Sequence, residues 1–483
     1  MPQWVHQAWP WFLTTLHVAL FLGATAHIVL RKRDVRAAIG WAGFVWLVPV
    51  LGSIAYFVLG INRIQRQAVA LRAGESWKNL PDLSLTPQET QLRERFETEH
   101  PNLMGLATLC GKLTGHSALP GNRVEPLIDG DEAFPAMLAA IGGAERSVAL
   151  QSYIFDSDRV GEMFLEALIA ARDRGIEVRA LIDDVGSRYS RPNMVRRLRK
   201  AGLKVAAFLP SRAPKLIRFA NLRNHRKILV IDGRTGFTGG TNIREGHWLS
   251  MNPKEPVQCL HFRLEGPVVR HLQETFAIDW TFAANESLAG ETWFPEIERQ
   301  GPVWARGIPD GPDEDFEKLA EAMFAALAAA RRSVRIVTPY FLPHAPLIEA
   351  LNSAALRGVQ VEIHLPEVNN ILLVQWAAAA QYWQLLEKGC RIFLTPPPFD
   401  HTKLMLVDGL WSLIGSTNWD PRSLRLNFEF NVECYDPELA ARLEALVARR
   451  LETSHEVTLE EVRALPLGKQ LRNGLARLLS PYL

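Results

Sequence analysis

The sequence predicts a duplicated α/β unit that follows two membrane-spanning helices. Three observations predict this fold class. Two charge-free apolar stretches open the chain, a strand–helix–glycine–strand order occurs twice, and a histidine–lysine motif also occurs twice. At roughly 100–200 residues per domain, 483 residues correspond to about three units, or to one duplicated core with an extra segment.

The composition excludes several classes of protein. Hydrophobic residues make up 48% of the chain and charged residues 22%, which excludes wholesale disorder. A net charge of +2 disfavours a dedicated nucleic-acid-binding protein, which is usually strongly basic. The four cysteines contain no Cys-x-x-Cys pair, so neither a disulfide scaffold nor a structural zinc site is expected.

The apolar stretches at the front are long enough to cross a bilayer. Residues 11–30 and 37–61 contain no Asp, Glu, Lys or Arg. About 20 helical residues span a hydrocarbon core of about 30 Å. Trp41, Trp46 and Tyr56 are aromatic residues of the kind that gather at membrane interfaces. The sequence therefore predicts a two-helix membrane anchor.

Alternatives to two spans stay open. The first stretch could be a signal peptide, although no basic segment precedes it and a second apolar stretch follows at once. The second could be re-entrant, with a kink at Pro49 and Gly52. Basic residues lie both between the stretches and after the second one, so the charge pattern does not set the orientation.

The remainder of the chain contains an internal α/β repeat. Its first copy runs from a strand at 147–155 through a helix at 160–174 and Gly175 to a strand at 176–182. Its second copy has the corresponding segments at 333–341, 347–357, Gly358 and 359–365. The shared order and spacing indicate duplication of one unit.

A histidine–lysine motif occurs once in each copy. Both occurrences read His-x-Lys-x4-Asp-x6-Gly-[Gly/Ser]-Thr-Asn. The residues that define them are His225, Lys227, Asp232 and Asn242 in the first copy, and His401, Lys403, Asp408 and Asn418 in the second. Two occurrences at matching places of a repeat are far stronger evidence for a site than one.

The spacing of the motif suits phosphodiester chemistry. His225 and Lys227 lie two residues apart and project from the same face of a strand, as do His401 and Lys403. Paired half-sites would supply cations and amides that stabilise phosphoryl charge. One imidazole could attack phosphorus while the other transfers protons. This chemistry requires no metal, and neither a metal nor another cofactor is expected.

The motifs resemble those of the phospholipase D superfamily, and nearly the whole chain resembles its bacterial cardiolipin synthases. Thr338–Phe341, Arg422-Ser423, Leu426–Glu429 and the ending at 477–481 are similar to that family as well. The resemblance implies duplicated phospholipase D-like domains with pseudo-twofold symmetry and one active site between them.

The resemblance also implies residue roles. His225 would be the nucleophile and His401 the general acid and base. Lys227, Lys403, Asn242 and Asn418 would hold the phosphate. Asp232 and Asp408 complete the catalytic motifs, more as structural supports than as reacting groups. Glu429 would orient one histidine through its ring N–H.

One departure from the family pattern lies at Cys259. Members often have an acidic residue in the first domain at the place equivalent to Glu429. Alignment backward from Gly266-Pro267 and Asp436-Pro437 puts Cys259 there. Cysteine cannot supply the same charge-assisted hydrogen bond. Either this substitution is real, and a neighbour replaces the acid or one imidazole is less well oriented, or the alignment carries a misplaced gap.

The expected organisation divides the chain into five parts: a membrane anchor at 1–61, a connector at 62–120, a first domain at 121–300, a second domain at 301–465 and an amphipathic tail at 466–483. The resemblance implies a multi-pass protein of the bacterial cytoplasmic membrane. Its substrate would be phosphatidylglycerol and its product cardiolipin, made through a phosphohistidine, with the bilayer as partner and no nucleic acid. The oligomeric state is left open.

Three rival functions share these features. A hydrolytic phospholipase D would use the same residues with water as the acceptor. A nuclease of the superfamily would also use them, although apolar helices and a charge of +2 disfavour it. A non-enzymatic membrane scaffold is a different class, and two complete His-Lys-Asn sets argue against it.

Three further segments carry basic or amphipathic patterns outside the motifs. The basic residues of 191–200 form either a solvated helix face or a site for anionic head groups. Lys215, Arg218, Arg223 and Arg226 adjoin the first motif, which favours a role with anionic lipid. Leu467–Leu479 has amphipathic spacing and would either bind an interface or pack on the enzyme body.

Overall fold

The computed structural model describes residues 3–32, 35–57, 87–210, 222–312 and 315–480. The chain divides into two compact units, Met1–Gln67 and Ala68–Leu483. The first unit contains α1 (Gln3–Arg31), α2 (Val35–Leu47) and α3 (Pro49–Ala55). Lys215 and Arg218 lie outside the described residues.

The N-terminal unit is a small helical cluster. Ala24, Ile28, Val45 and Tyr56 form its core, and the Tyr56 hydroxyl lies 2.7 Å from Nδ1 of His27. The second predicted span is divided between α2 and α3, because Pro49 begins a new helix there. Among the described helices, none meets the combined length and hydropathy that a membrane span requires. Two spans therefore remain a prediction.

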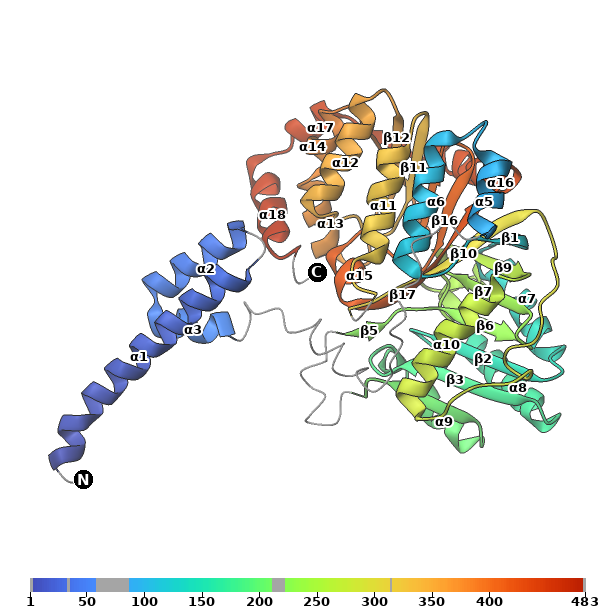
Figure 1. The fold of residues 1–483 in the computed structure, drawn as a ribbon, viewed down its shortest axis with the longest axis horizontal. Coiled ribbons are helices and arrows are strands. Elements are labelled where there is room, and N and C mark those ends of the chain that lie inside the picture. The colour runs from blue at the N-terminus through green and yellow to red at the C-terminus, as the bar shows by residue number, and fades with distance from the viewer. Residues whose placement is uncertain (1–2, 33–34, 58–86, 211–221, 313–314, 481–483) are drawn as a thin grey trace. The chain divides into compact units, whose positions relative to one another are not determined.

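Ala68–Leu483 is built on one long mixed sheet (Figure 1). Its strand order is β18-β13-β12-β11-β15-β16-β17-β10-β1-β9-β7-β6-β2-β3-β4, and β5 pairs with β17. The strands of the first half are β1 (Leu119–Ile128), β2 (Ser147–Ser152), β3 (Glu177–Asp183), β4 (Lys204–Phe208), β5 (Arg223–Asn224), β6 (Ile228–Ile231), β7 (Thr235–Gly239), β8 (Val257–Gln258) and β9 (Leu260–Glu265). Those of the second half are β10 (Val303–Asp310), β11 (Ser333–Val337), β12 (Gln360–Pro366), β13 (Arg391–Thr395), β14 (Phe399–Asp400), β15 (Leu404–Val407), β16 (Trp411–Gly415), β17 (Asn427–Tyr435) and β18 (His455–Val457).

The strand order confirms the predicted duplication. From the central antiparallel pair β1–β10, the order outward is β9-β7-β6-β2-β3-β4 on one side and β17-β16-β15-β11-β12-β13 on the other. Each of the first-half strands in this order thus has a counterpart at the same distance from the centre, whereas β5 and β8 lie outside it. Both copies contain the predicted strands and helices. The helices and second strands lie within one or two residues of the prediction, whereas the first strands end earlier than predicted, at Ser152 and Val337.

Helices cover both faces of the sheet. In the first half these are α7 (Asp129–Gly142), α8 (Arg159–Asp173), α9 (Met194–Lys200) and α10 (Val269–Ala284). Successive side chains of a strand point to opposite faces. Val148 and Leu150 of β2 share a core with α7 and α8, whereas Gln151 bonds Asp279 of α10. The helix α10 therefore covers the opposite face.

The second half repeats this layering. Its helices are α11 (Lys318–Ala329), α12 (Ala345–Leu356), α13 (Leu372–Ala379), α14 (Tyr382–Leu386), α15 (Pro421–Arg425), α16 (Pro437–Leu451), α17 (Leu459–Arg463) and α18 (Leu467–Leu478). Val334 and Ile336 of β11 join the core that α11 and α12 cover, and Arg335 bonds Glu444 of α16 on the other face. Asp436 caps α16 by accepting a hydrogen bond from Leu439 N–H.

Two helices of the segment between the anchor and the repeat belong to this unit. They are α5 (Pro87–Phe96) and α6 (Pro101–Thr114), and α6 packs against α11. Leu103 and Cys110 are fully buried in the core of the second half. Arg306 of β10 donates to backbone carbonyls at both Ala107 and His116. These contacts fix α6 to the enzyme body.

Candidate active site

The two histidine motifs occupy equivalent positions beside the centre of the sheet. His225 lies between β5 and β6, and His401 lies between β14 and β15. The apolar strands that follow, Ile228–Ile231 and Leu404–Val407, are buried along their whole length. Burial of each strand fixes its register, and the register determines where the preceding histidine lies.

Each histidine is held by a strand of the other half. The backbone N–H of His225 donates to the Phe428 carbonyl at 2.9 Å, where β5 pairs with β17. The backbone N–H of His401 donates to the Gln258 carbonyl at 2.8 Å, where β14 pairs with β8. The structure thus brings both histidines to the contact between the two halves, as one shared site requires.

A buried carboxylate orients the His225 ring. Both oxygens of Glu429 lie 3.0 Å from Nδ1 of His225. The same carboxylate accepts hydrogen bonds from the Ser416 hydroxyl at 2.5 Å and from the Asn427 amide at 3.1 Å. A carboxylate beside Nδ1 favours the tautomer with its proton on that nitrogen. The lone pair of Nε2 is then available for attack.

His401 has a backbone carbonyl where His225 has a carboxylate. Its Nδ1 lies 2.9 Å from the Gly240 carbonyl oxygen. A Cβ on Gly240 would lie 2.5 Å from Sγ of Cys259 and 2.6 Å from the His401 carbonyl oxygen. Only glycine fits this approach, because the loop passes between those two groups. The His401 ring is therefore held by a neutral acceptor.

The strand pairings decide the alignment at Cys259. Phe428 accepts from the N–H of His225, and Gln258 accepts from the N–H of His401, so these two acceptors are equivalent. The next residues, Glu429 and Cys259, are therefore equivalent as well. Burial raises the pKa of the Cys259 thiol to about 11, so the thiol is neutral. The predicted departure is a real substitution, and the possibility of a misplaced gap is excluded.

Both motif lysines fold back onto their own strands. Lys227 Nζ donates to the His225 carbonyl at 2.8 Å, and Lys403 Nζ donates to the His401 carbonyl at 2.6 Å. Both lysines are buried, at 3% and 4% exposure. Each ammonium thus lies beside its histidine, where a phosphate bound to the imidazoles would meet it.

Burial sets the protonation of the site. It lowers the pKa of His225 to about 4, against the attraction of Glu429, and it lowers the pKa of His401 well below the ordinary value. Burial also lowers the pKa of Lys227 to about 7 and that of Lys403 to about 8. Both imidazoles are therefore neutral at pH 7. A bound phosphodiester anion would raise all four pKa values by its charge.

The motif aspartates lie at the far ends of their strands. Asp232 accepts from the backbone N–H groups of Glu145, Arg146 and Ser147. Asp408 accepts from those of residues 331–333 in the same way. At about 3.3 Å per residue, seven residues place each carboxylate roughly 20 Å along the strand from its histidine. The aspartates fix the start of β2 and β11.

The motif asparagines are buried after β7 and β16. Asn242 Oδ1 accepts from Ile154 N–H at 3.4 Å, and Asn418 Nδ2 donates to the Ser423 hydroxyl at 3.2 Å. Ser423 follows the short helix cap at Asp420. The structure gives these amides anchoring contacts, and their role toward phosphate stays a prediction.

Comparisons with known proteins identify the family of this chain. A family model described as a cardiolipin synthase, PLD-like domain matches residues 137–280 and 323–451, which is more than half of the chain. The chain belongs to the cardiolipin synthase family of phospholipase D-like proteins. A second model, described as a phospholipase D-nuclease N-terminal region, matches residues 19–60.

Individual relatives cover nearly the whole chain. It is 32% identical to the major cardiolipin synthase ClsA of Bacillus subtilis over 98% of each chain. It is 34% identical to cardiolipin synthase A of Pseudomonas fluorescens, again over 98% of each chain. The crystal structure of phosphatidylserine synthase from Haemophilus influenzae matches with a TM-score of 0.60 and 14% identity, over 74% of this chain and 95% of that one. The last likeness shows the fold alone.

This cardiolipin synthase family member has site residues that the sequence did not single out. His247 is buried with its ring centroid 5.9 Å from that of His401. Tyr153 lies 5.0 Å from His225, and Tyr340 lies 6.3 Å from His401, both measured between ring centroids. Tyr340 lies within the family-like segment Thr338–Phe341, so that resemblance was its available signal. His247 has no such signal in one sequence.

Arg223 and Arg226 are buried, so neither belongs to a basic patch on the surface, and a role with anionic lipid stays a prediction. Arg226 is 1% exposed, and its guanidinium lies 2.8 and 2.7 Å from the two carboxylate oxygens of Asp279. It also donates to the Glu429 carbonyl at 2.9 Å. Arg223 is buried and donates to the Leu222 carbonyl. Neither arginine faces solvent, and Arg226 supports the site through the Glu429 backbone.

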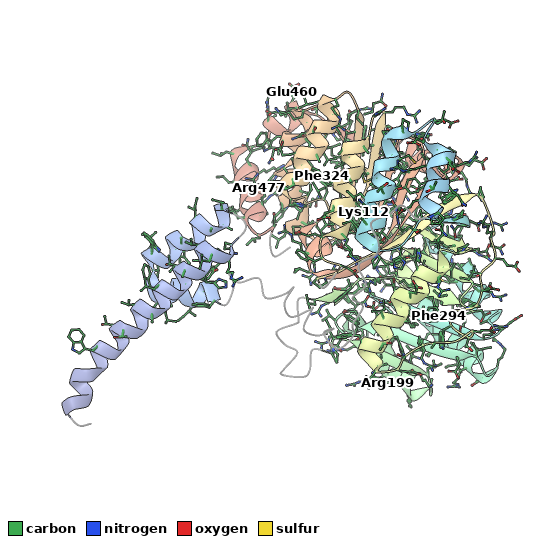
Figure 2. The ribbon with its side chains drawn as sticks, viewed as in Figure 1. Lys112, Arg199, Phe294, Phe324, Glu460 and Arg477 are labelled. Atoms are coloured by element: carbon green, nitrogen blue, oxygen red, sulfur yellow. The ribbon has the colours of Figure 1, made fainter. Side chains whose placement is uncertain are left out.

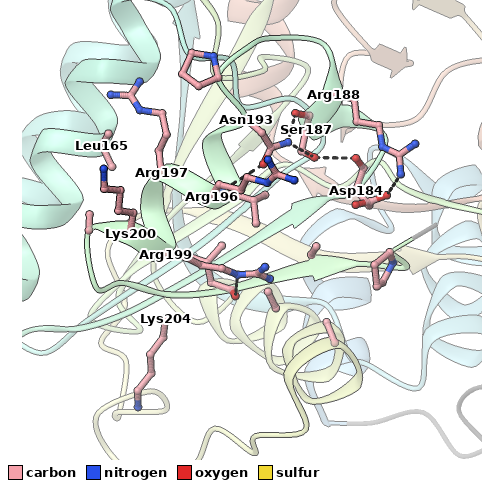
Figure 3. Close-up of a pocket in the computed structure, with 18 of the residues that line it drawn as sticks. Leu165, Asp184, Ser187, Arg188, Asn193, Arg196, Arg197, Arg199, Lys200 and Lys204 are labelled. Carbon is pink, nitrogen blue, oxygen red and sulfur yellow. Dashed lines mark hydrogen bonds and ion pairs between the residues drawn. The ribbon is translucent and has the colours of Figure 1, made fainter. Parts of the chain in front are cut away.

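A wide basic groove lies apart from the histidines. Its volume is about 1720 Å³, and α9, β4 and the end of α10 line it (Figure 3). Its cationic side chains include Arg196, Arg199 and Lys200, while Arg197 is engaged by Glu162. The basic helix face expected from the sequence is therefore α9. Its charge is partly neutralised by the protein itself.

Potential metal ligands also gather away from the motifs. Among the described residues, His116, His271 and Glu274 come within metal-ligand distance of one another. Nδ1 of His271 accepts the Gly307 N–H at 3.1 Å, so the neutral ring carries its proton on Nε2. No lone pair of that ring is left for a cation. We assign no metal to this group.

Proposed function

We propose that the protein is a phosphatidyltransferase that makes cardiolipin and glycerol from two phosphatidylglycerol molecules. The observation that carries the proposal is the pair formed by His225 and Glu429 across the two halves. It leaves a neutral, oriented imidazole next to a second histidine and two lysines. The cardiolipin synthase relatives support the identity of the lipids.

In the first half-reaction, Nε2 of His225 attacks the phosphorus of phosphatidylglycerol. An N–P bond forms, and the bond from phosphorus to the head-group glycerol oxygen breaks. The bound anion raises the pKa of His401, so this ring takes up a proton from solvent. It then gives that proton to the departing oxygen, and glycerol leaves. Lys227 and Lys403 stabilise the charge on the phosphoryl oxygens.

In the second half-reaction, His401 removes the proton from a head-group hydroxyl of a second phosphatidylglycerol. The hydroxyl oxygen attacks phosphorus, the N–P bond breaks, and His225 is restored. The cardiolipin synthase relatives support an alcohol acceptor over water.

We also propose that residues 1–61 anchor the protein in the bacterial cytoplasmic membrane through two spans. Charge-free apolar stretches support this, as do exposed side chains such as Leu30, Leu47 and Leu51, at 79%, 84% and 67%. Such side chains gain free energy in hydrocarbon. Retention in the membrane fraction after carbonate extraction is expected. Release of the protein into the supernatant would contradict the anchor.

A single assay tests the proposed chemistry. Purified full-length protein in detergent is incubated with phosphatidylglycerol labelled on both an acyl chain and the head-group glycerol, and the products are separated. Cardiolipin and free glycerol are expected, whereas phosphatidic acid would indicate a hydrolase. His225→Ala should abolish product, and His455→Ala, at an exposed histidine, should not. Full activity in His225→Ala would refute the assigned nucleophile.

A further inference from the structure

The last helix turns its apolar side away from the protein. Leu467, Leu471, Leu475 and Leu478 of α18 are between 59% and 70% exposed. At 3.6 residues per turn, these four positions fall within an arc of about 80°. Soluble helices usually bury such a stripe. Here the stripe faces outward.

Packing on the opposite side fixes this orientation. Asn473 and Ala476 are the buried residues of α18, and they project roughly opposite the leucines. The helix packs on α13, and the Arg472 guanidinium lies 4.4 Å from the centroid of the Trp376 ring. The Arg472 side chain also donates to Asn473 Oδ1. The expected docking onto the enzyme body thus uses the small and polar face and leaves the leucines free for another contact.

The start of α13, the helix on which α18 packs, also exposes apolar side chains. Ile371, Leu372 and Leu373 are 43%, 56% and 41% exposed. Together with the four leucines of α18 they form what we call the leucine surface. Several large apolar side chains exposed on two neighbouring helices are typical of a site of contact with a membrane or a protein.

The leucine surface adjoins the active site. The Tyr340 hydroxyl donates to Asn370 Oδ1 at 2.8 Å, and Asn370 immediately precedes Ile371. The other side of the same tyrosine faces His401, at 6.3 Å between ring centroids. One residue therefore connects the edge of the leucine surface to the catalytic imidazole.

Two of the three basic residues of α18 flank the leucine arc. At 3.6 residues per turn, Arg472 and Arg477 lie roughly 100–120° from the middle of the arc, whereas Lys469 lies on the opposite side. Lys469, Arg472 and Arg477 are the ionisable residues of α18, and all are basic. Figure 2 labels Arg477 near the end of this helix. Leucines flanked by basic residues are typical of helices that lie in the bilayer interface. Each basic residue near an anionic membrane contributes about 1 kcal/mol of attraction.

We propose that the leucine surface is where the catalytic unit lies on the anionic bilayer, and that lipid head groups reach His401 past Asn370 and Tyr340. The proposal rests on the proposed function, because that function requires two bilayer lipids at the histidines. A protein occupant of the same surface, such as a second copy of the chain, would obstruct that route. The bilayer is therefore the occupant that fits the position of this surface.

A fluorescent label tests contact with lipid. All four native cysteines are buried, so Leu475→Cys in the full chain can be labelled selectively with an environment-sensitive dye. In vesicles of phosphatidylglycerol and phosphatidylcholine, a spin label on the lipid acyl chains should quench this dye strongly. The control is Glu166→Cys on α8, an exposed position, which should not be quenched. A dye at 475 that lipid does not quench would overturn the proposal, whether it lies in water or is shielded by a second copy or by residues 1–67.

A variant with acidic residues in the leucine surface tests whether that surface is needed for turnover. Leu471→Glu/Leu475→Glu should lower activity toward phosphatidylglycerol in vesicles about tenfold or more, and leave activity toward a water-soluble short-chain phosphatidylglycerol unchanged. Leu356→Glu, at a leucine 69% exposed on α12, should affect neither. Equal losses on both substrates, or no loss on either, would overturn the proposal. Absence of cardiolipin from the unmodified protein on both substrates would instead refute the proposed function, while the quenching measurement still tests contact with lipid.

Discussion

Glu429 and His225 come from opposite halves of a duplicated sheet, and both carboxylate oxygens of Glu429 lie 3.0 Å from Nδ1 of the imidazole. Ser416 and Asn427 hold the carboxylate in turn. Neither half contains the complete pair, so the orientation of the proposed nucleophile depends on correct assembly of both halves.

Glu429→Gln should lower kcat for cardiolipin formation roughly 10- to 150-fold, because a charge-assisted hydrogen bond contributes about 1.5–3 kcal/mol. The neutral amide also permits the wrong tautomer of His225. The measurement is turnover of labelled phosphatidylglycerol, with an unchanged melting temperature as the control for folding. A kcat within twofold of the unmodified protein would show that the carboxylate does not orient the nucleophile.

Cys259→Asp should give His401 the carboxylate partner that His225 already has. A nearby negative charge raises the pKa of an imidazole, so the general acid would stay protonated to higher pH. The descending, basic side of the profile of kcat against pH should therefore move upward. Cys259→Ser is the matched control and should leave the profile in place, since serine adds no charge. A shift of equal size in both variants would argue against an electrostatic cause.

Deprotonation of the two lysines should limit activity on the alkaline side. Burial lowers the pKa of Lys227 to about 7 and that of Lys403 to about 8, so their charged forms persist below these values and are lost above them. Productive binding of an anionic phosphodiester requires the charged forms. We expect kcat/KM to fall as the pH rises through 7 to 8. Lys227→Arg should flatten the fall near pH 7, because arginine stays charged. A constant kcat/KM from pH 6 to 9 would contradict this assignment.

Much of this arrangement could be predicted from the sequence. The repeat of strand, helix, glycine and strand gave the duplicated α/β unit, because each segment carries its own periodicity. The motif spacing gave His225 with Lys227, and His401 with Lys403, since i and i+2 share a face of a strand. These predictions depend on local pattern, which one sequence contains.

The rest depends on contacts between distant segments. The sequence alone suggests that Arg226 is a basic surface residue, yet it pairs with Asp279, which lies 53 positions later on another element. Glu89 lies among the charged residues of α5, yet it is 8% exposed and lies 3.6 Å from Arg306. His247 approaches His401 only after the two halves assemble. Local pattern has no information about such partners, because tertiary packing chooses them.

The buried pair Arg226–Asp279 should be essential for stability. Both side chains are at most 1% exposed, and Asp279 also accepts from Gln151 and Asn224. Removal of one partner from a buried ion pair leaves the other charge uncompensated, at a cost of about 3–5 kcal/mol. Asp279→Ala should therefore lower the melting temperature of the detergent-solubilised protein by several degrees.

Arg270→Ala, which breaks an exposed pair with Glu274, is the control and should change the free energy of unfolding by less than about 1 kcal/mol. Equal melting temperatures for Asp279→Ala and Arg270→Ala would show that the buried pair contributes no more than a surface pair. Arg226 also donates to the Glu429 carbonyl, so its loss of Asp279 should disturb the active site. At a low temperature where Asp279→Ala is folded, we expect a smaller kcat and the same product.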